Sequence, residues 1–300
     1  MIMNTMVAHL SESLIDEIVA AVGLPTTRLT HTVFWRLFRN ITDRLAYIGA
    51  SFDQISEEKG LPAASAWALT HFCKGLQVHG AENIPDRGPL LVVSNHPGTY
   101  DSLALFANLE GHKIRCVTSV ITPLDLLPNA RQYFLFTPRK DIQERMLVLR
   151  KAIRHLQGGG TLVYFGSGHR DPDPTVYSGA GRSIDHWLNV FDTFFKYVKD
   201  LRVLPTIVSG VLSTEWVKNP ITRLRKKQID KQRLAEFGQV ITQLRKPGKL
   251  MLTPRISVGT NFSEQDLRKS AGSGKLFRAV IKRVKALFQE SSSYFGDFLP

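Results

Sequence analysis

The chain has 300 residues, of which 43% are hydrophobic and 22% are charged, with 22 glycines. This is the composition of a globular protein, and it excludes a disordered, collagen-like or disulfide-rich chain. Its cysteines, Cys73 and Cys116, fit no metal-binding or disulfide spacing, so we expect no metal site and a reducing compartment. The formal net charge is +13, and residues 201–300, with 19 basic and 7 acidic residues, carry +12 of it. Such asymmetry predicts a polyanionic partner, either nucleic acid or an anionic membrane surface.

No segment has the ~18 consecutive apolar residues that a membrane-spanning helix needs. No basic region precedes an apolar stretch at the N-terminus, so no signal peptide is predicted. We therefore expect a cytoplasmic protein that works, if at a membrane, as a peripheral protein on its inner face.

The first part of the chain, residues 1–75, is predicted to be a helical region. Apolar residues recur at helical spacing over Leu10–Val22, where Ser13–Asp16 has the pattern of a capping pair. The same spacing predicts helices over Phe34–Ile48 and Pro62–Lys74.

After Gly75, short β-rich runs alternate with helical runs. The predicted strands are Leu90–Ser94, Ile114–Thr118, Phe134–Phe136, Thr161–Phe165, Val203–Val208 and Leu250–Val258. The predicted helices are Asp101–Leu109, Asp141–Gln157, Arg182–Lys199 and Arg223–Leu244. Alternation of this kind predicts an α/β fold over residues 76–265, with a mostly parallel sheet flanked by helices. Residues 266–300 are predicted to contain a basic amphipathic helix over Lys275–Gln289.

The turn after the first predicted strand of that region carries His96 and Asp101, and the four residues between them begin with a Pro-Gly pair. Catalytic residues favour the carboxyl ends of strands in α/β folds. A carboxylate there can accept a hydrogen bond from one ring nitrogen and leave the other free as a base. In the alternative interpretation, Asn95 caps a helix, Pro97 lies in its first turn and His96 is an ordinary loop residue.

The segment Asn95-His96-Pro97-Gly98-Thr99-Tyr100-Asp101 resembles the Asn-His-x4-Asp block of the glycerolipid acyltransferase superfamily, which includes glycerol-3-phosphate and lysophosphatidate acyltransferases. The segment before it, residues 78–93, resembles that family's approach to the block. Phe136–Arg139, Phe165–Arg170 and Val203–Ile207 resemble the second, third and fourth blocks in the same order. The resemblance covers about residues 76 to 210.

The resemblance implies transfer of a fatty acyl chain from an acyl-CoA or acyl-ACP thioester to a hydroxyl of a glycerophosphate or lysophospholipid. His96 would take the hydroxyl proton, and Asp101 would orient His96. Neither a covalent enzyme intermediate nor a cofactor is implied. The substrate-binding residues that the resemblance implies are Arg139, Lys140, Ser167, Gly168, His169 and Arg170.

The chain departs from the family pattern at two positions. Ser167 stands where the third block has Glu, and Tyr133 stands where the second block begins with Gly. The missing Glu leaves open a non-phosphate acceptor, such as a sugar, an amine or another alcohol, and a membrane-surface protein without catalysis. Arg170 could also be a surface charge paired with Asp171 or Asp173.

A serine hydrolase is the least favoured alternative, because Gly166-Ser167-Gly168 lacks the Gly-x-Ser-x-Gly spacing.

Residues 201–300 contain two basic runs, one between Arg223 and Arg233 and one between Lys275 and Lys285. No fingerprint of a nucleic-acid-binding module accompanies them, so we expect an anionic membrane surface and no nucleic acid. The aromatic run Phe34–Phe38 could be an interfacial anchor, or it could pack against the other N-terminal helices.

Overall fold

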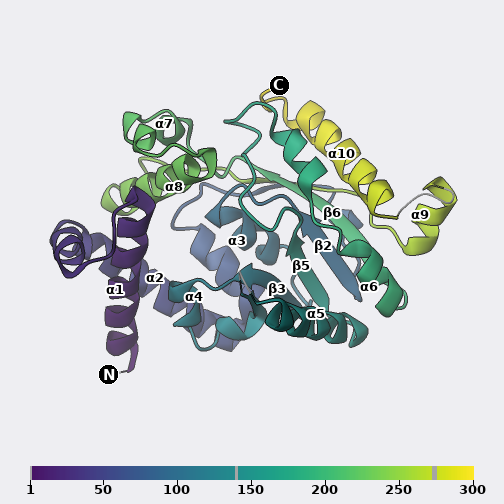
Figure 1. Cartoon of the computed structure of the whole chain (residues 1–300), viewed down its shortest axis with the longest axis horizontal. Coiled ribbons are helices and arrows are strands. Elements are labelled where there is room, and N and C mark those ends of the chain that lie inside the picture. The colour runs from purple at the N-terminus through teal and green to yellow at the C-terminus, as the bar shows by residue number, and fades with distance from the viewer. Residues whose placement is uncertain (1, 139–140, 272–275) are drawn as a thin grey trace.

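A seven-stranded sheet forms the centre of the computed structural model, which describes residues 2–138, 141–271 and 276–300 (Figure 1). In chain order the strands are β1 (Gln77–His79), β2 (Leu90–Ser94), β3 (Ile114–Ser119), β4 (Phe134–Thr137), β5 (Thr161–Phe165), β6 (Arg202–Ser209) and β7 (Arg255–Val258). Their order across the sheet is β1-β7-β6-β2-β5-β3-β4, and all neighbours are parallel except β6 and β7. The predicted α/β fold with a mostly parallel sheet is confirmed.

Helices cover both faces of the sheet. They are α1 (Ile2–Val22), α2 (Arg28–Leu69), α3 (Thr99–Ala107), α4 (Thr122–Asp125), α5 (Ile142–Gln157), α6 (Phe191–Tyr197), α7 (Thr214–Val217), α8 (Gln228–Arg245), α9 (Glu264–Ala271) and α10 (Leu276–Phe295). Leu90 and Val92 of β2 lie in one core with residues of α2 and α3, whereas Leu91 and Val93 lie in a second core with residues of α5, α6 and α10. A strand buried on both faces must be apolar at successive positions, which is why β2 was predicted with its observed bounds.

The N-terminal region differs in detail from the prediction. α2 consists of two helical segments joined at a non-helical kink at Gly60 (φ 83°), just before Pro62, and the two helices predicted here correspond to these segments. Its first turn has a capping box between Thr27 and Thr30. The predicted capping pair at Ser13 is wrong, because α1 begins at Ile2 and Ser13 lies in its interior.

The predicted helix over Arg182–Lys199 is also wrong as a single element. A 3-10 helix over Ala180–His186 is followed by an extended residue, Trp187, and α6 begins at Phe191. The Trp187 ring packs directly over Gly166, where a Cβ atom would lie 2.0 Å from the ring. The amide of Leu188 donates to the Gly166 carbonyl (2.7 Å), so this tertiary contact overrides the helical pattern.

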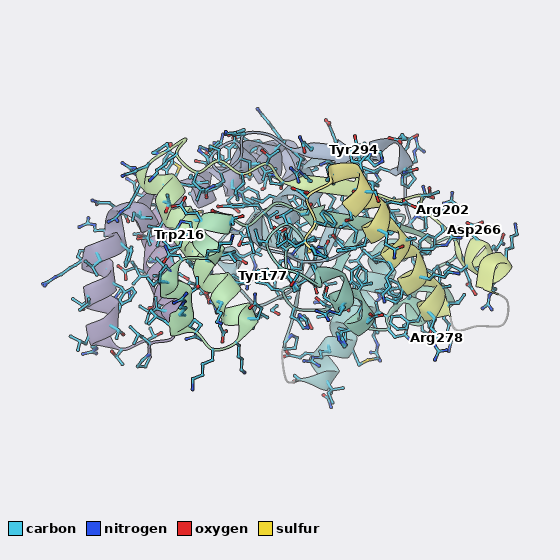
Figure 2. All side chains as sticks on the ribbon, turned by 90° about the horizontal axis from the view of Figure 1, so that it is seen from above. Tyr177, Arg202, Trp216, Asp266, Arg278 and Tyr294 are labelled. Atoms are coloured by element: carbon cyan, nitrogen blue, oxygen red, sulfur yellow. The ribbon has the colours of Figure 1, made fainter. Side chains whose placement is uncertain are left out.

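The C-terminal helix is confirmed as α10, which carries the labelled Arg278 and Tyr294 in Figure 2. Its apolar side, including Val280, Val284 and Leu287, packs into the second core. Lys275, where that helix was predicted to begin, lies outside the described residues. The division of the chain at residues 75 and 265 stays a prediction.

The sheet brings together the loops that follow β6, β2 and β5, because these are adjacent parallel strands. The side chain of Asn95 donates to the Val208 carbonyl (2.8 Å) and accepts from the Val208 amide (2.8 Å), which extends the β2–β6 pairing by one position. Asn95 is therefore not a helix cap, and Pro97 lies before α3 rather than in its first turn.

Buried Asp173 fixes the loop after β5 to the loop after β6. Its carboxylate accepts backbone hydrogen bonds from Gly210 (3.1 Å), Val211 (2.8 Å) and Leu212 (3.0 Å). The two loops that flank β2 are thus tied to each other as well as to the sheet.

Candidate active site

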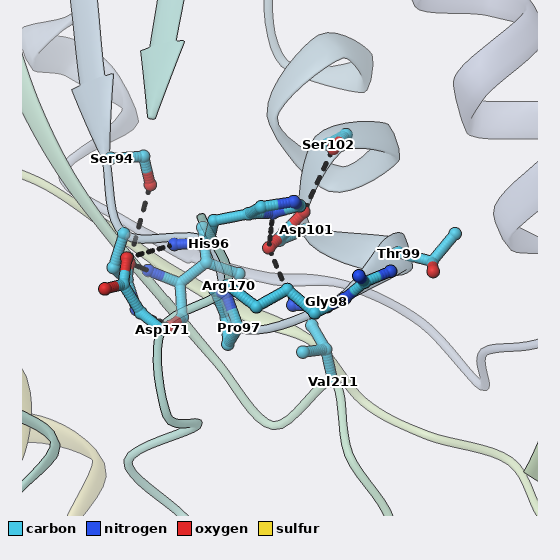
Figure 3. A network of polar contacts seen from close by, with 12 residues as sticks. Ser94, His96, Pro97, Gly98, Thr99, Asp101, Ser102, Arg170, Asp171 and Val211 are labelled. Carbon is cyan, nitrogen blue, oxygen red and sulfur yellow. Dashed lines mark hydrogen bonds and ion pairs between the residues drawn. The ribbon is translucent and has the colours of Figure 1, made fainter. Parts of the chain in front are cut away.

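His96 and Asp101 meet across the turn between β2 and α3, as Figure 3 shows. His96 Nδ1 lies 2.8 Å from Asp101 Oδ2, and the Gly98 amide donates to the same oxygen (2.9 Å). The hydroxyl of Ser102 donates to the other carboxylate oxygen (3.0 Å). Asp101 is fully buried. Because a carboxylate accepts hydrogen bonds, the ring proton lies on Nδ1 and Nε2 has a free lone pair.

The environment of His96 favours its protonated form. Burial alone would lower its pKa, but the charge of Asp101 and the hydrogen bond to it act in the opposite direction. Arg170 lowers the pKa and Glu236 raises it, and the net result is a pKa above the ordinary value. The ring stacks on Phe165, with centroids 4.3 Å apart, and the side chain is still 25% exposed. His96 is therefore held in place, basic and accessible.

Asp171 holds the backbone of His96. Its carboxylate accepts from the His96 amide (2.9 Å), and its own amide donates to the His96 carbonyl (2.8 Å). Burial raises the pKa of Asp171, whereas hydrogen bonds from the His96 amide and the Ser167 hydroxyl oppose that rise. These paired contacts tie the loop after β5 to the turn after β2.

Ser167 is buried, and its hydroxyl lies within hydrogen-bond distance of the His169 carbonyl (2.6 Å) and Asp171 (3.0 Å). It thus supports the loop from within. Gly168 and His169 are exposed beside it, and His169 Nδ1 contacts the Arg170 carbonyl (3.0 Å). The role of these three residues in substrate binding stays a prediction.

Arg170 forms an ion pair that was not predicted. Its Nε donates to Glu236 of α8 (2.9 Å), and not to Asp171 or Asp173 as one interpretation had it. The Arg170 side chain is 29% exposed and that of Glu236 6%. Thr99, the first residue of α3, also donates to Glu236 (3.2 Å). Arg170, Glu236 and His96 therefore belong to one electrostatic cluster.

Helix α8 presents a buried polar stripe to this cluster, which we call the α8 stripe. Its members are Gln232, Glu236, Gln239 and Gln243. They recur at intervals of four, three and four residues, which places them on one helix face. This spacing of polar residues inside a predicted helix is the signal that could have identified them from the sequence.

The members of the α8 stripe bind the surrounding loops. Gln232 donates to the carbonyls of Pro97 (2.6 Å) and Asp171 (2.9 Å), and so joins the turn after β2 to the loop after β5. Gln239 pairs with the backbone of the loop after β6 through the Val211 carbonyl (2.9 Å). In Figure 1, α8 lies at the same end of the molecule as α7 and the upper end of α1.

Arg139 and Lys140 lie outside the described residues. The strand before them, β4, is at the edge of the sheet and is separated from β2 by β3 and β5. Among the residues that the structure describes, no group of three or more His, Cys, Asp or Glu side chains is placed to hold a metal ion.

Comparison with known proteins gives a family match over part of the chain. The acyltransferase family model matches residues 75–195, which include His96, Asp101 and Arg170 but not α8. No curated protein matches the sequence. The crystal structure of the 1-acyl-sn-glycerophosphate (LPA) acyltransferase PlsC from Thermotoga maritima is similar to 94% of this chain and 95% of its own, with 17% identity and a TM-score of 0.44.

The arrangement of His96 and Asp101 predicts a specific titration. In NMR spectra of the histidine ring, His96 should have its proton on Nδ1 in the neutral form and a pKa above about 6.5. Asp101→Asn should lower this pKa, because it removes the charge that stabilises the imidazolium. A His96 that titrates identically in both proteins would contradict the arrangement.

Proposed function

From the match of residues 75–195 to the acyltransferase family model, we propose that the chain moves a fatty acyl group from an acyl-CoA or acyl-ACP thioester to a hydroxyl of a glycerophosphate or lysophospholipid. The match supports the predicted enzyme class, an acyltransferase. The observation that carries the finer proposal is the pairing of His96 Nδ1 with buried Asp101, which leaves Nε2 as a base.

The proposed reaction is a direct transfer. The acceptor oxygen attacks the thioester carbonyl carbon while His96 Nε2 takes the hydroxyl proton. The C–S bond then breaks, and the thiolate leaves with the proton that His96 has carried. A positioned base of this kind supplies typically ~10²–10⁴-fold of the rate. Asp101 orients the ring and stabilises the imidazolium.

The attack places a developing negative charge on the thioester carbonyl oxygen, and the geometry of the turn limits which groups can stabilise this oxyanion. Pro97 has no amide hydrogen, and the Gly98 amide is already committed to Asp101. Backbone donors for the developing charge therefore have to come from other residues near the turn, or from the cationic side chain of Arg170.

Arg170 is the described residue best suited to the acceptor. A guanidinium can bind two oxygens of a phosphate at once through its planar donors. Nε is used by Glu236, and among the described residues no partner binds the terminal nitrogens of this partly exposed side chain. The pairing with buried Glu236 offsets the positive charge of Arg170. This favours the second candidate acceptor, one without a phosphate.

Two other interpretations lose support from the same contacts. A non-catalytic binding protein would not need a base assembled on a buried carboxylate. A serine hydrolase would need a histidine ring beside Ser167, but its hydroxyl is directed to a backbone carbonyl and to Asp171.

We further propose a peripheral position at an anionic membrane surface, on the inner face of the membrane. No helix among the described residues has the length and apolar character that crossing a membrane requires. The turn between α1 and α2 lies against the segment before α8, because a Cβ atom on Gly23 would lie 1.5 Å from the Arg225 guanidinium. These two segments carry exposed apolar and basic side chains, which we call the basal patch: Leu24, Arg28, Leu29, Arg223, Leu224, Lys226 and Lys227.

The basal patch has the composition of a membrane-binding surface. Leu29 is 75% exposed and Leu224 is 65% exposed, and exposed apolar side chains that form a contiguous patch mark interaction surfaces. Each Lys or Arg near an anionic bilayer contributes about 1 kcal/mol. Within the aromatic run Phe34–Phe38, Phe38 packs on the core, whereas Leu37 is 61% exposed. One part of the run is therefore buried, and another part is free to contact a membrane surface.

The catalytic proposal predicts that free thiol is released when an acyl thioester and a suitable acceptor are both present. A panel of acyl-CoA and acyl-ACP donors crossed with glycerol 3-phosphate, lysophospholipids and their phosphate-free analogues identifies the pair. His96→Ala should lower turnover by about 10³-fold, and Asp101→Asn should come close to it.

His9→Ala, at an exposed histidine of α1, is the control and should keep normal turnover. Near-normal transfer by both active-site variants would refute the mechanism. Equal use of phosphorylated and phosphate-free acceptors would contradict the proposal of a phosphate-bearing acceptor and support the second candidate, an acceptor without a phosphate.

The basal patch predicts binding to vesicles rich in anionic lipid in a sedimentation assay. High salt should weaken this binding, since surface charges are screened within ~10 Å at 0.1 M. Lys226→Glu with Lys227→Glu, and separately Leu29→Glu, should weaken it, whereas Ile142→Glu, at an equally exposed position on α5, should not. Equal binding to neutral and anionic vesicles would show that the charge plays no part.

A further inference from the structure

Glu236 is the one residue of the α8 stripe that carries a charge, and it lies outside the segment matched by the family model. Its two carboxylate oxygens have different partners. Oε1 accepts from Arg170 of the loop after β5, and Oε2 accepts from Thr99 at the start of α3. One carboxylate therefore joins the two segments that flank His96.

The carboxylate also packs against the turn itself. A Cβ atom on Gly98 would lie 3.4 Å from Glu236 Oε1 and 3.3 Å from a methyl group of Val211. Figure 3 shows the Arg170 side chain running alongside Gly98 toward Thr99, on the side of the turn where Val211 is drawn. The space beside Gly98 is thus occupied by the ion pair.

Four ionisable groups from four segments face one another here: His96, Asp101, Arg170 and Glu236. Burial raises the pKa of Glu236, while Arg170 and His96 act to lower it and Asp101 acts to raise it. In return, Glu236 helps to raise the pKa of His96, against the effect of Arg170. Glu236 is thus a buried carboxylate with two hydrogen-bond donors, one of which is the Arg170 guanidinium, in the immediate surroundings of His96.

We propose that Glu236 is a positioning residue of the active site, which holds the Arg170 guanidinium at the mouth of the site by its Nε and directs its terminal nitrogens to an anionic or hydroxyl oxygen of the acceptor. The inference rests on the proposed acyl transfer for its kinetic part. Its electrostatic part concerns the folded protein and does not depend on the reaction.

The contacts of the α8 stripe explain how Glu236, which follows Arg170 by 66 residues in the chain, can position the Arg170 side chain. Gln232, one turn before Glu236, binds the Pro97 and Asp171 carbonyls, so α8 cannot move without the turn and the loop after β5. Gln243, farther along, accepts from the Tyr100 hydroxyl (2.7 Å). Glu236 lies between Gln232 and Gln243 on α8, so these contacts fix its position relative to the turn after β2.

The test is Glu236→Gln, which keeps the shape of the side chain and removes its charge. The KM for the acceptor should rise by about 3- to 10-fold, because Arg170 loses a charged partner but remains present. The KM for the thioester donor should stay unchanged. The acid limb of the kcat/KM profile should move to lower pH, because loss of the nearby negative charge lowers the pKa of His96.

Two further variants separate positioning from simple loss of stability. In an Arg170→Ala background, Glu236→Gln should have no additional effect on acceptor KM, since residues that act as a unit are not additive. Glu236→Asp keeps the charge but shortens the side chain, so it should raise acceptor KM and leave the acid limb in place.

Glu17→Gln is the matched control. It removes a carboxylate that pairs with Arg233, also on α8 but on the side facing α1, and it should change neither acceptor KM nor the pH profile. An unchanged acceptor KM in Glu236→Gln, or additive effects with Arg170→Ala, would overturn the proposal.

NMR titration of His96 separates this inference from the proposed function. Glu236→Gln should lower the pKa of His96 whether or not the acceptor and donor have been identified. A lower pKa in a protein without acyl-transfer activity would refute the function and retain the electrostatic role of Glu236, whereas an unchanged pKa in an active enzyme would refute that role alone.

Discussion

The hydrogen bond between His96 Nδ1 and Asp101 is the interaction on which the rest of the site depends. It fixes the tautomer, raises the pKa of the imidazole and leaves Nε2 accessible. A fully buried carboxylate is costly unless its oxygens are satisfied, and here Gly98, Ser102 and His96 satisfy them. Much of the surrounding structure acts to keep this short turn in one conformation.

Three neighbouring strand ends supply that rigidity. Asn95 continues the β2–β6 pairing with its side chain, Asp171 clamps the His96 backbone, and Asp173 joins the loops after β5 and β6. Helix α8 then closes the assembly through its own buried polar stripe. Together these contacts hold the turn after β2 in one arrangement, as the proposed role of His96 as a base requires.

The sequence was sufficient for the features that depend on local pattern. β2 and β5 were predicted with their observed bounds because their residues are mostly apolar on both faces. His96 and Asp101 were predicted to meet because only four residues, which form a turn, separate them. β1 was missed because only three residues form it, with two of them exposed.

The contacts of Glu236 could not be predicted in the same way, because they depend on tertiary packing. Glu236 is 66 residues from Arg170 and 137 from Thr99, and its position follows from how α8 docks on the sheet. Phe165–Arg170 resembles a family block that has Glu at the position of Ser167. In the structure, the buried carboxylate beside Arg170 is that of Glu236 on α8. A polar stripe at helical spacing, such as that of Gln232 to Gln243, is the kind of pattern that can be sought in related sequences.

Pre-steady-state thiol release tests the central claim most directly, namely that His96 activates the acceptor for direct attack on the thioester. With the donor that the panel identifies, mixing of enzyme and acyl thioester without acceptor should give no burst of free thiol. Rapid release should begin when the acceptor is added. A burst equal to the enzyme concentration in the absence of acceptor would reveal an acyl-enzyme intermediate and contradict the mechanism.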